Sequence, residues 1–307
     1  MTRPIEVLVP GLWSRRGDAP DPRTPGLLAK ILGRGEMAPS TAVGWEDAAA
    51  ARLGFRPSVS GRRRWLAVPV SLTAGMTDVV AQAVGDLGPE DSAALVQSIL
   101  PELEAASAAL RETSPGLFEL KLDAEGDWDM PPPSAAVGRP IRTPRLESPA
   151  ARRLQVLGTA VQMAWFNHPV NAERARRGHA PVHGLCFWSP GIRDGTPAVR
   201  GIAGGGAIAA WLAEAAGVAW SADPLCREAD LAVLDALQRA EHAGRRDEML
   251  GSLSGDLLAP LLTRLREGAA DELRLHDPGT AVLRLRRSDW RRFWRRPRTL
   301  AAMTWGT

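Results

Sequence analysis

The segment His168-Pro169-Val170-Asn171, with Arg174 three residues on, concentrates side chains that could do chemistry. An arginine held beside helix and strand ends can bind a phosphate or a carboxylate through paired hydrogen bonds. We therefore predict a site for a small anionic ligand formed by His168, Asn171, Arg174, His183 and Trp188. The alternative is structural: His168 and Asn171 bind local backbone groups, and the arginines face water.

Other catalytic patterns are incomplete. His179 and His183 have the spacing of metal ligands, but Pro181 breaks the helix that would align the two rings, so we predict no metal site there. The sequence GSLSG at 251–255 is not a nucleophile elbow, because its middle residue is Leu253 rather than serine. Only two lysines are present, which makes lysine-based covalent catalysis improbable.

A glycine cluster at 204–206 precedes a predicted helix. Gly204, Gly206 and Ala209 spell G-x-G-x-x-A, and Asp223 follows at a distance typical of dinucleotide sites. Three interpretations stay open: a dinucleotide site, a turn whose backbone N–H groups bind an anion, and glycines with only a structural role.

Hydrophobic periodicity and turn residues predict the elements that must position these groups. Ser148 and Pro149 form a typical helix start, and the following helix should end before Pro169. The segment 117–122 is expected to be the first arm of a hairpin, and Pro69 should shorten the strand at 65–70 or place it at an edge. Predicted strands lie at 5–9, 65–70, 117–122, 184–188, 231–234, 272–275 and 282–285, and predicted helices at 90–111, 149–168, 207–216 and 245–267.

This alternation predicts an α/β fold with a central, mostly parallel sheet flanked by helices, and a short C-terminal hairpin and helix. Prolines crowd 131–149, so we predict an N-terminal part at 1–130, a linker at 131–149 and a C-terminal part at 150–307, or one composite domain.

Composition excludes disordered and fibrous classes, since 45% of the 307 residues are hydrophobic and 24% are charged. The two cysteines form no CxxC pair, which is typical of a reducing compartment. The N-terminal apolar stretch is short and closed by Pro10, unlike a signal peptide, and no run is long enough to span a membrane. We predict a cytoplasmic protein.

Positive charge concentrates at the C-terminus. Residues 284–307 hold eight arginines and one acid, although the whole chain has a net charge of only +3. On a helix, Trp290, Phe293 and Trp294 would share one face and arginines the other. This helix either docks on the core or binds an anionic membrane surface or an acidic protein partner. No nucleic-acid-binding pattern accompanies it.

The stretch HPVNAERARRGHAPVHGLCFWSPG resembles the signature HPVNxxRxxxGxxPxN(S/A)xxxWGxG, shared by archaeal-type cofactor-independent phosphoglycerate mutases and proteobacterial RpfE-like regulatory proteins. The regulatory family is the closer match, because IEVLVPGLW, RRRWLAVPVSL, ADLAVLD, LLAPLLTRLREG and SDWRRFWRRP resemble its segments in the same order. Asn171 and Arg174 match the signature. His183-Gly184 replaces Asn-Ser, Ser189 replaces glycine, and Ala67-Val68-Pro69 stands where the family has Arg-Ala-Asp-Pro.

The resemblance implies an alkaline-phosphatase-like scaffold, whose enzymes use two divalent metals and a serine or threonine nucleophile. Here Val9-Pro10-Gly11-Leu12-Trp13 replaces the aspartate after the first strand, and no C-terminal Asp-His ligand pair appears. We therefore expect a degenerate, regulatory or ligand-sensing protein that needs no cofactor. One alternative is a Mn-dependent mutase or phosphoesterase with ligands drawn from Asp223, Asp230, Asp235, His242 and His276. Another is an interaction module that uses Trp290, Phe293, Trp294 and their arginines.

Overall fold

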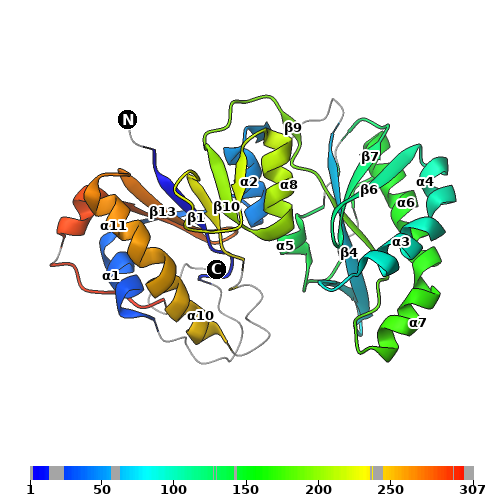
Figure 1. Ribbon diagram of the computed structural model, residues 1–307, viewed down its shortest axis with the longest axis horizontal. Coiled ribbons are helices and arrows are strands. Elements are labelled where there is room, and N and C mark those ends of the chain that lie inside the picture. The colour runs from blue at the N-terminus through cyan, green and yellow to red at the C-terminus, as the bar shows by residue number, and fades with distance from the viewer. Residues whose placement is uncertain are drawn as a thin grey trace. The chain divides into compact units, whose positions relative to one another are not determined.

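The computed structural model describes residues 3–13, 24–56, 63–126, 128, 130–141, 144–235, 237, 245–292 and 294–300. The chain forms two compact units (Figure 1): unit 1 joins Met1–Leu53 to Pro197–Thr307, and unit 2 is Gly54–Thr196. The predicted linker at 131–149 therefore lies inside unit 2 rather than between the units. Its backbone pairs with a strand there: the amides of Gly138 and Ile141 donate to the carbonyls of Ala81 and Val79 at 2.7 and 2.8 Å.

Unit 1 contains a seven-stranded sheet in the order β11-β10-β12-β1-β13-β14-β2. The first five strands in this order are mutually parallel. At one edge β14 pairs antiparallel with β13, and β2 pairs antiparallel with β14, so only β14 runs against the others. The mostly parallel sheet predicted from the sequence is thus found in this unit. The strands are β1 (Ile5–Leu8), β2 (Glu36–Pro39), β10 (Gly201–Gly204), β11 (Ala219–Ser221), β12 (Leu231–Val233), β13 (Glu272–Asp277) and β14 (Ala281–Arg286).

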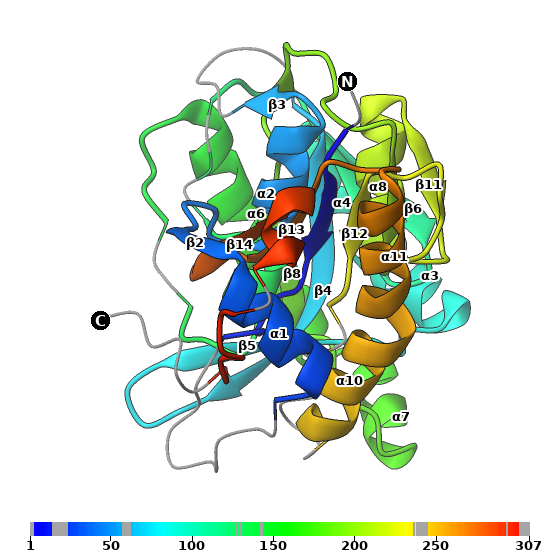
Figure 2. The same ribbon diagram turned by 90° about the vertical axis from the view of Figure 1, so that its left-hand side faces the viewer.

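Helices cover both faces of this sheet (Figures 1 and 2). Ile5 and Val7 point to one face, where they share a core with α1, η1 and α11. Glu6 points to the other face, where it pairs with Arg52 of α2 at 2.7 Å, and α2 packs against α8. The helices are α1 (Gly26–Arg34), α2 (Trp45–Arg52), α8 (Gly206–Ala216), α10 (Arg246–Ser252), the π-helix η1 (Leu253–Leu258), α11 (Ala259–Glu267) and the 3₁₀-helix η2 (Arg287–Arg291).

The helix predicted at 245–267 is confirmed with one modification: α10, η1 and α11 follow one another without a break, and η1 has π geometry. Gly255 lies within η1, and π-bulges are often found at functional sites. The helix ends where predicted, because Gly268 adopts φ +83° and closes the last turn. Among the described helices, none is both long and apolar enough to cross a membrane.

Unit 2 is built on an antiparallel sheet, so a parallel sheet does not describe the whole chain. The order is β5-β4-β7-β6, and β8 also pairs with β4. The strands are β4 (Trp65–Ala74), β5 (Val79–Ala83), β6 (Ala108–Ser114), β7 (Leu117–Leu122) and β8 (Gly184–Trp188), and a separate pair joins β3 (Phe55–Arg56) to β9 (Ile192–Arg193).

The expectation that Pro69 shortens its strand or places it at an edge is wrong. β4 is the longest strand described, and its neighbours β7 and β8 lie on opposite sides. β7 pairs only with Trp65–Ala67, so Pro69 lies beyond the end of that ladder. The backbone of the next residue, Val70, points to the β8 side, where the Val70 carbonyl accepts from the amide of His183 at 2.9 Å. The backbone groups of consecutive residues in a strand point to alternate sides, so those of Pro69 point to the β7 side, beyond the end of the β7 ladder. Proline has no N–H to donate, and no described strand pairs with Pro69 on that side.

Helix α6 (Pro149–Phe166) begins as predicted, since the Ser148 hydroxyl accepts from the amide of Ala151 at 2.9 Å. Its inner face buries Leu154, Leu157, Val161 and Trp165 in the core of unit 2. The other helices of this unit are α3 (Pro89–Ser98), α4 (Leu100–Ala105), α5 (Pro133–Ala136) and α7 (Pro169–Arg176).

The helix predicted at 90–111 is only partly correct. It divides into α3 and α4, and the chain reverses at Ser107, which has φ +51°. Residues 108–114 then form β6, because they pair with β7 across a turn at Gly116. Residues 117–122 are therefore the second arm of a hairpin rather than the first.

Candidate functional site

The predicted anion-binding residues lie in unit 2, around helix α7. Pro169 begins this helix, and the preceding residue caps it: the Nδ1 atom of His168 accepts from the amide of Val170 at 3.3 Å. Asn171 and Arg174 follow on the inner side of the helix and are both buried. The segment HPVNAER thus encodes a helix start and two inward-pointing polar side chains, Asn171 and Arg174.

Asn171 holds two backbone segments together. Its amide nitrogen donates to the carbonyls of Trp165 and Val182 at 2.7 and 2.9 Å. Its oxygen accepts from the amide of Val182 at 2.8 Å. Protein groups therefore occupy both ends of this side chain, which favours the structural alternative for Asn171.

Arg174 is 1% exposed and bonds to protein groups on three sides. Its Nε donates to the carbonyl of Ala180 at 2.9 Å, and its Nη2 donates to Oδ1 of Asp86 at 2.5 Å. Its Nη1 contacts the backbone carbonyl of Asp86 at 3.3 Å and Oδ2 of Asp91 at 3.4 Å. Burial alone would raise the pKa of Asp86, but Arg174 and His179 outweigh it and lower that pKa. The guanidinium therefore binds α7 to the segment 86–91.

His183 and Trp188 lie at opposite ends of β8. Nδ1 of His183 accepts from the amide of Leu72 at 3.0 Å, so its remaining proton is on Nε2. Burial lowers the pKa of His183, which also favours the neutral ring. Trp188 is buried and lies opposite Leu66 on β4. His168, Asn171 and Arg174 thus belong to one helix and its cap, and Asn171 binds the backbone of Val182 next to His183, whereas Trp188 lies at the far end of β8.

Unit 1 offers a second candidate, at the carboxyl edge of its parallel strands. The chain leaves β10 through three glycines, Gly204, Gly205 and Gly206, whose φ angles are +71°, +68° and +59°. A Cβ on Gly204 would lie 2.4 Å from the carbonyl oxygen of Val233, and a Cβ on Gly205 would lie 2.7 Å from Cβ of Ala209. The first two glycines therefore permit close packing, whereas a Cβ on Gly206 would meet open space.

The loop after β1 is fixed at this same edge. Asp277 ends β13 and is buried, and its two carboxylate oxygens accept from the amides of Gly11 and Trp13 at 2.8 and 2.7 Å. Arg246 of α10 donates to the carbonyls of Gly11 and Leu12 at 2.7 and 3.1 Å. The segment that replaces the expected metal-binding aspartate thus has a defined conformation.

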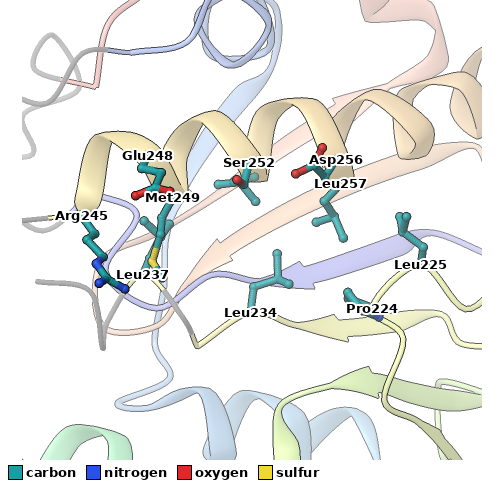
Figure 3. Close-up of a pocket in the computed structure, with 11 residues that line it drawn as sticks. Pro224, Leu225, Leu234, Leu237, Arg245, Glu248, Met249, Ser252, Asp256 and Leu257 are labelled. Carbon is teal, nitrogen blue, oxygen red and sulfur yellow. The ribbon is translucent and has the colours of Figure 1, made fainter. Parts of the chain in front are cut away.

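A pocket of about 400 Å³ opens beside the carboxyl end of β12 (Figure 3). Helix α10 and η1 form one wall, and the residues that follow β11 and β12 form the other. Most of the lining is apolar: Pro224, Leu225, Leu234, Leu237, Met249, Leu253 and Leu257. The polar lining is Arg245, Glu248, Ser252 and Asp256, with Arg245 at one end of the pocket in Figure 3.

The sequence predicted none of the pocket residues as a site. The available signals were the end of the buried strand at 231–234 and the polar positions of an amphipathic helix at 245–267. Only the order of the strands in the sheet places these two segments on opposite walls of one pocket.

The proposed metal ligands do not converge in the part of the chain that the structure describes. Asp223 and Asp235 follow β11 and β12 at the carboxyl edge, but Asp230 precedes β12 at the opposite edge, where Arg200 holds it at 2.6 Å. Oδ1 of Asp223 accepts from the amide of Leu225 at 2.9 Å. His242 lies outside the described residues. Within those residues no group of three or more His, Cys, Asp or Glu side chains could hold a metal ion, so the described donors do not fit a two-metal centre.

His276 lies within β13, and its side chain is largely buried. Burial, with smaller effects from Arg52, Arg274 and Arg284, lowers its pKa to about 4. Among described atoms its Nδ1 has no hydrogen-bond partner. A neutral, largely buried imidazole of this kind adds a pH-sensitive group to the sheet face opposite the one that carries Leu273 and Leu275.

Within the described residues, the predicted C-terminal helix is limited to the 3₁₀-helix Arg287–Arg291, which includes Trp290. Trp290 packs on the core of unit 1, and the Arg34 guanidinium carbon lies 4.2 Å from its ring centroid. Trp294 lies beyond the helix and is 67% exposed. Phe293 is outside the described residues, so the three aromatic residues do not form one described helical face.

Comparison with known proteins gives distant likenesses only. No protein-family model matches the chain, and no curated protein matches it either. Among solved structures, the PH0037 protein from Pyrococcus horikoshii is 15% identical, covers 93% of this chain and 87% of its own, and has a TM-score of 0.47. The cofactor-independent phosphoglycerate mutase from Thermoplasma acidophilum is 13% identical, covers 93% and 90%, and has a TM-score of 0.37.

Proposed function

We propose that this protein binds a small carboxylated or phosphorylated ligand with an apolar portion in the pocket of unit 1, and that it acts as a regulatory or sensing protein rather than by transferring phosphate. The observation that carries the proposal is the pocket itself, with its apolar lining and a guanidinium at one end. The RpfE-like, phosphoglycerate-mutase-like scaffold implied by the HPVN signature belongs to the same proposal.

The position of the pocket supports ligand binding. After β10 the chain passes to α8 on one face of the sheet, whereas after β12 it continues to α10, η1 and α11, which cover the other face. Adjacent parallel strands whose connections diverge in this way leave a crevice at their carboxyl ends, where α/β proteins bind ligands. Pro224, which lines the pocket, also lies against the glycine turn, 3.7 Å from the place of a Cβ on Gly204.

The polarity of the lining indicates the ligand class. Arg245 is the cationic group of the lining, and a guanidinium binds carboxylates and phosphates through paired hydrogen bonds. The apolar side chains opposite it suit a hydrocarbon portion, whose transfer from water contributes roughly 25 cal/mol for each Å² buried. Glu248 and Asp256 are exposed, so water solvates their carboxylates beside the pocket.

The bonding of the nearby carboxylates favours ligand binding without phosphoryl transfer. Two described acids at this edge already serve the fold: Asp277 binds the amides of Gly11 and Trp13, and Asp223 binds that of Leu225. The resemblance implies the same conclusion, because Val9-Pro10-Gly11 replaces the usual ligand aspartate.

Thermal denaturation of metal-stripped protein with octanoate tests the proposal. A ligand present at 100 times its dissociation constant stabilises the folded state by about 2.7 kcal/mol. Each kcal/mol raises Tm by roughly 2–4 °C for a folding unit of this size. We expect octanoate to raise Tm without metal, and the neutral analogue 1-octanol to raise it much less.

Three variants locate the site. Arg245→Gln removes the guanidinium and Met249→Trp fills the pocket, so both should abolish the octanoate shift. Arg266→Gln, an exposed arginine of α11 outside the pocket, should retain it. Equal shifts with octanoate and octanol, or an unchanged shift in Met249→Trp, would overturn the proposal. A shift with 3-phosphoglycerate that appears only when Mn²⁺ is added would favour the mutase alternative instead.

A further inference from the structure

Helix α6 has a second apolar face, opposite the one it buries in the core. Val156, Met163 and Phe166 are 70%, 77% and 65% exposed, and Thr159 between them is exposed as well. At 100° per residue, Val156, Thr159, Met163 and Phe166 fall within an arc of roughly 80°, on the side away from Leu157 and Val161. Three large apolar side chains in one line on one helix form a patch rather than scattered exposed residues.

The spacing of this patch is that of a helix–helix seam. Val156, Thr159, Met163 and Phe166 are separated by three, four and three residues, which is the a-d-a-d pattern of a coiled coil. The residues beside the seam carry no charge: Gln155 and Gln162 on one side, and Ala160 and Asn167 on the other. Along these four positions a second copy of α6 would therefore meet no like charge, and the first charge on the same line is Arg152, one turn before Val156. No carboxylate on α6 selects a basic partner.

We propose that α6 pairs with α6 of a second copy of this chain, antiparallel, along the seam of Val156, Thr159, Met163 and Phe166. In this arrangement Val156 faces Phe166 and Thr159 faces Met163, so a small side chain meets a large one in each layer. Parallel pairing would instead bring Phe166 against Phe166.

The charge at the end of the helix selects the antiparallel direction. Arg152 and Arg153 lie in the first turns of α6 and are exposed. Antiparallel pairing places them beside the last turn of the partner helix, residues 163–166, which carries no charged side chain. Parallel pairing would place the arginines of the two copies together, where they repel each other.

Sedimentation velocity of the full chain tests the pairing over roughly a 100-fold range of concentration, because mass action governs dimer formation. We expect the weight-average mass to rise from the monomer toward twice that value. Met163→Glu should remain monomeric throughout. Met76→Glu is the matched control, since Met76 is fully exposed between β4 and β5 and lies outside the seam.

Cysteine cross-linking tests the direction. An oxidised mixture of Thr159→Cys and Met163→Cys chains should form the 159–163 disulfide faster than either chain alone forms its own, with the linked peptides identified by mass spectrometry. A monomeric wild type, or equal behaviour of Met163→Glu and Met76→Glu, would overturn the proposal. Preferred 159–159 linkage would overturn the antiparallel arrangement, and vesicle binding lost in Met163→Glu without self-association would assign the face to a lipid surface.

Discussion

Replacing Arg174 by methionine separates a structural role from a ligand-binding role. The guanidinium bonds to Asp86, to Asp91 and to the carbonyl of Ala180, and it is almost inaccessible to water. Removing one partner of a buried charge pair costs about 3–5 kcal/mol. The side chain of Asp86 is 44% exposed and can be rehydrated, which places the expected loss near the lower limit, at about 3 kcal/mol.

A loss of about 3 kcal/mol changes the unfolding equilibrium roughly 100-fold and lowers Tm by roughly 6–12 °C. Urea denaturation followed by circular dichroism and tryptophan fluorescence measures it. Arg176→Met is the matched control on the same helix: Arg176 is 76% exposed and pairs with Glu173, so the expected change is below about 0.5 kcal/mol. A loss under 1 kcal/mol for Arg174→Met would refute the structural assignment. Normal stability combined with lost binding of an anion would return Arg174 to the ligand site.

Three further predictions concern unit 1. In Asp277→Asn the new side-chain NH₂ group faces the amide of Gly11 or Trp13, so one hydrogen bond is lost. The free energy of unfolding should fall by about 2–4 kcal/mol in urea titrations, and an unchanged value would contradict the described loop. Gly205→Ala should destabilise by at least about 1 kcal/mol more than Gly206→Ala in the same assay, because both have positive φ but only at Gly205 does the new Cβ meet atoms within 3 Å. His276 has a folded-state pKa lowered to about 4 from 6.5, so the unfolded chain binds its proton first as the pH falls through that interval and stability is lost. From pH 7 to pH 4.5 the wild type should lose about 2–3 kcal/mol more than His276→Leu, and parallel pH profiles would show that the imidazole is not responsible.

Local sequence signals located many of the elements. Ser148-Pro149 and the apolar period that follows predicted α6. Between the strands predicted at 272–275 and 282–285 the chain contains Asp277-Pro278-Gly279, a typical turn sequence, and β13 and β14 pair across it. Gly268 fixed the end of α11. These signals work because a cap, a turn and a hydrophobic period each depend on residues within a few positions of one another. The prediction for residues 108–111 was wrong for the opposite reason: it rested on local sequence, which favours a helix, but pairing with β7 makes these residues part of a strand.

The candidate site also divides into features that local sequence predicts and features that depend on distant segments. The sequence identified His168, Asn171 and Arg174 as unusual, and the structure gives them a concentrated set of hydrogen bonds. The sequence could not show that Arg174 contacts Asp86 and Asp91, which lie more than 80 positions earlier. It therefore could not distinguish an arginine that binds a ligand from one that pairs with carboxylates of its own chain. The pocket of unit 1 was hidden for a related reason, since its two walls come from separate segments that only the order of the parallel strands brings together. The sequence alone determined which side chains are available and where helices start and stop. Tertiary structure decided which charges are already neutralised by protein groups, because burial and pairing depend on segments distant in the chain.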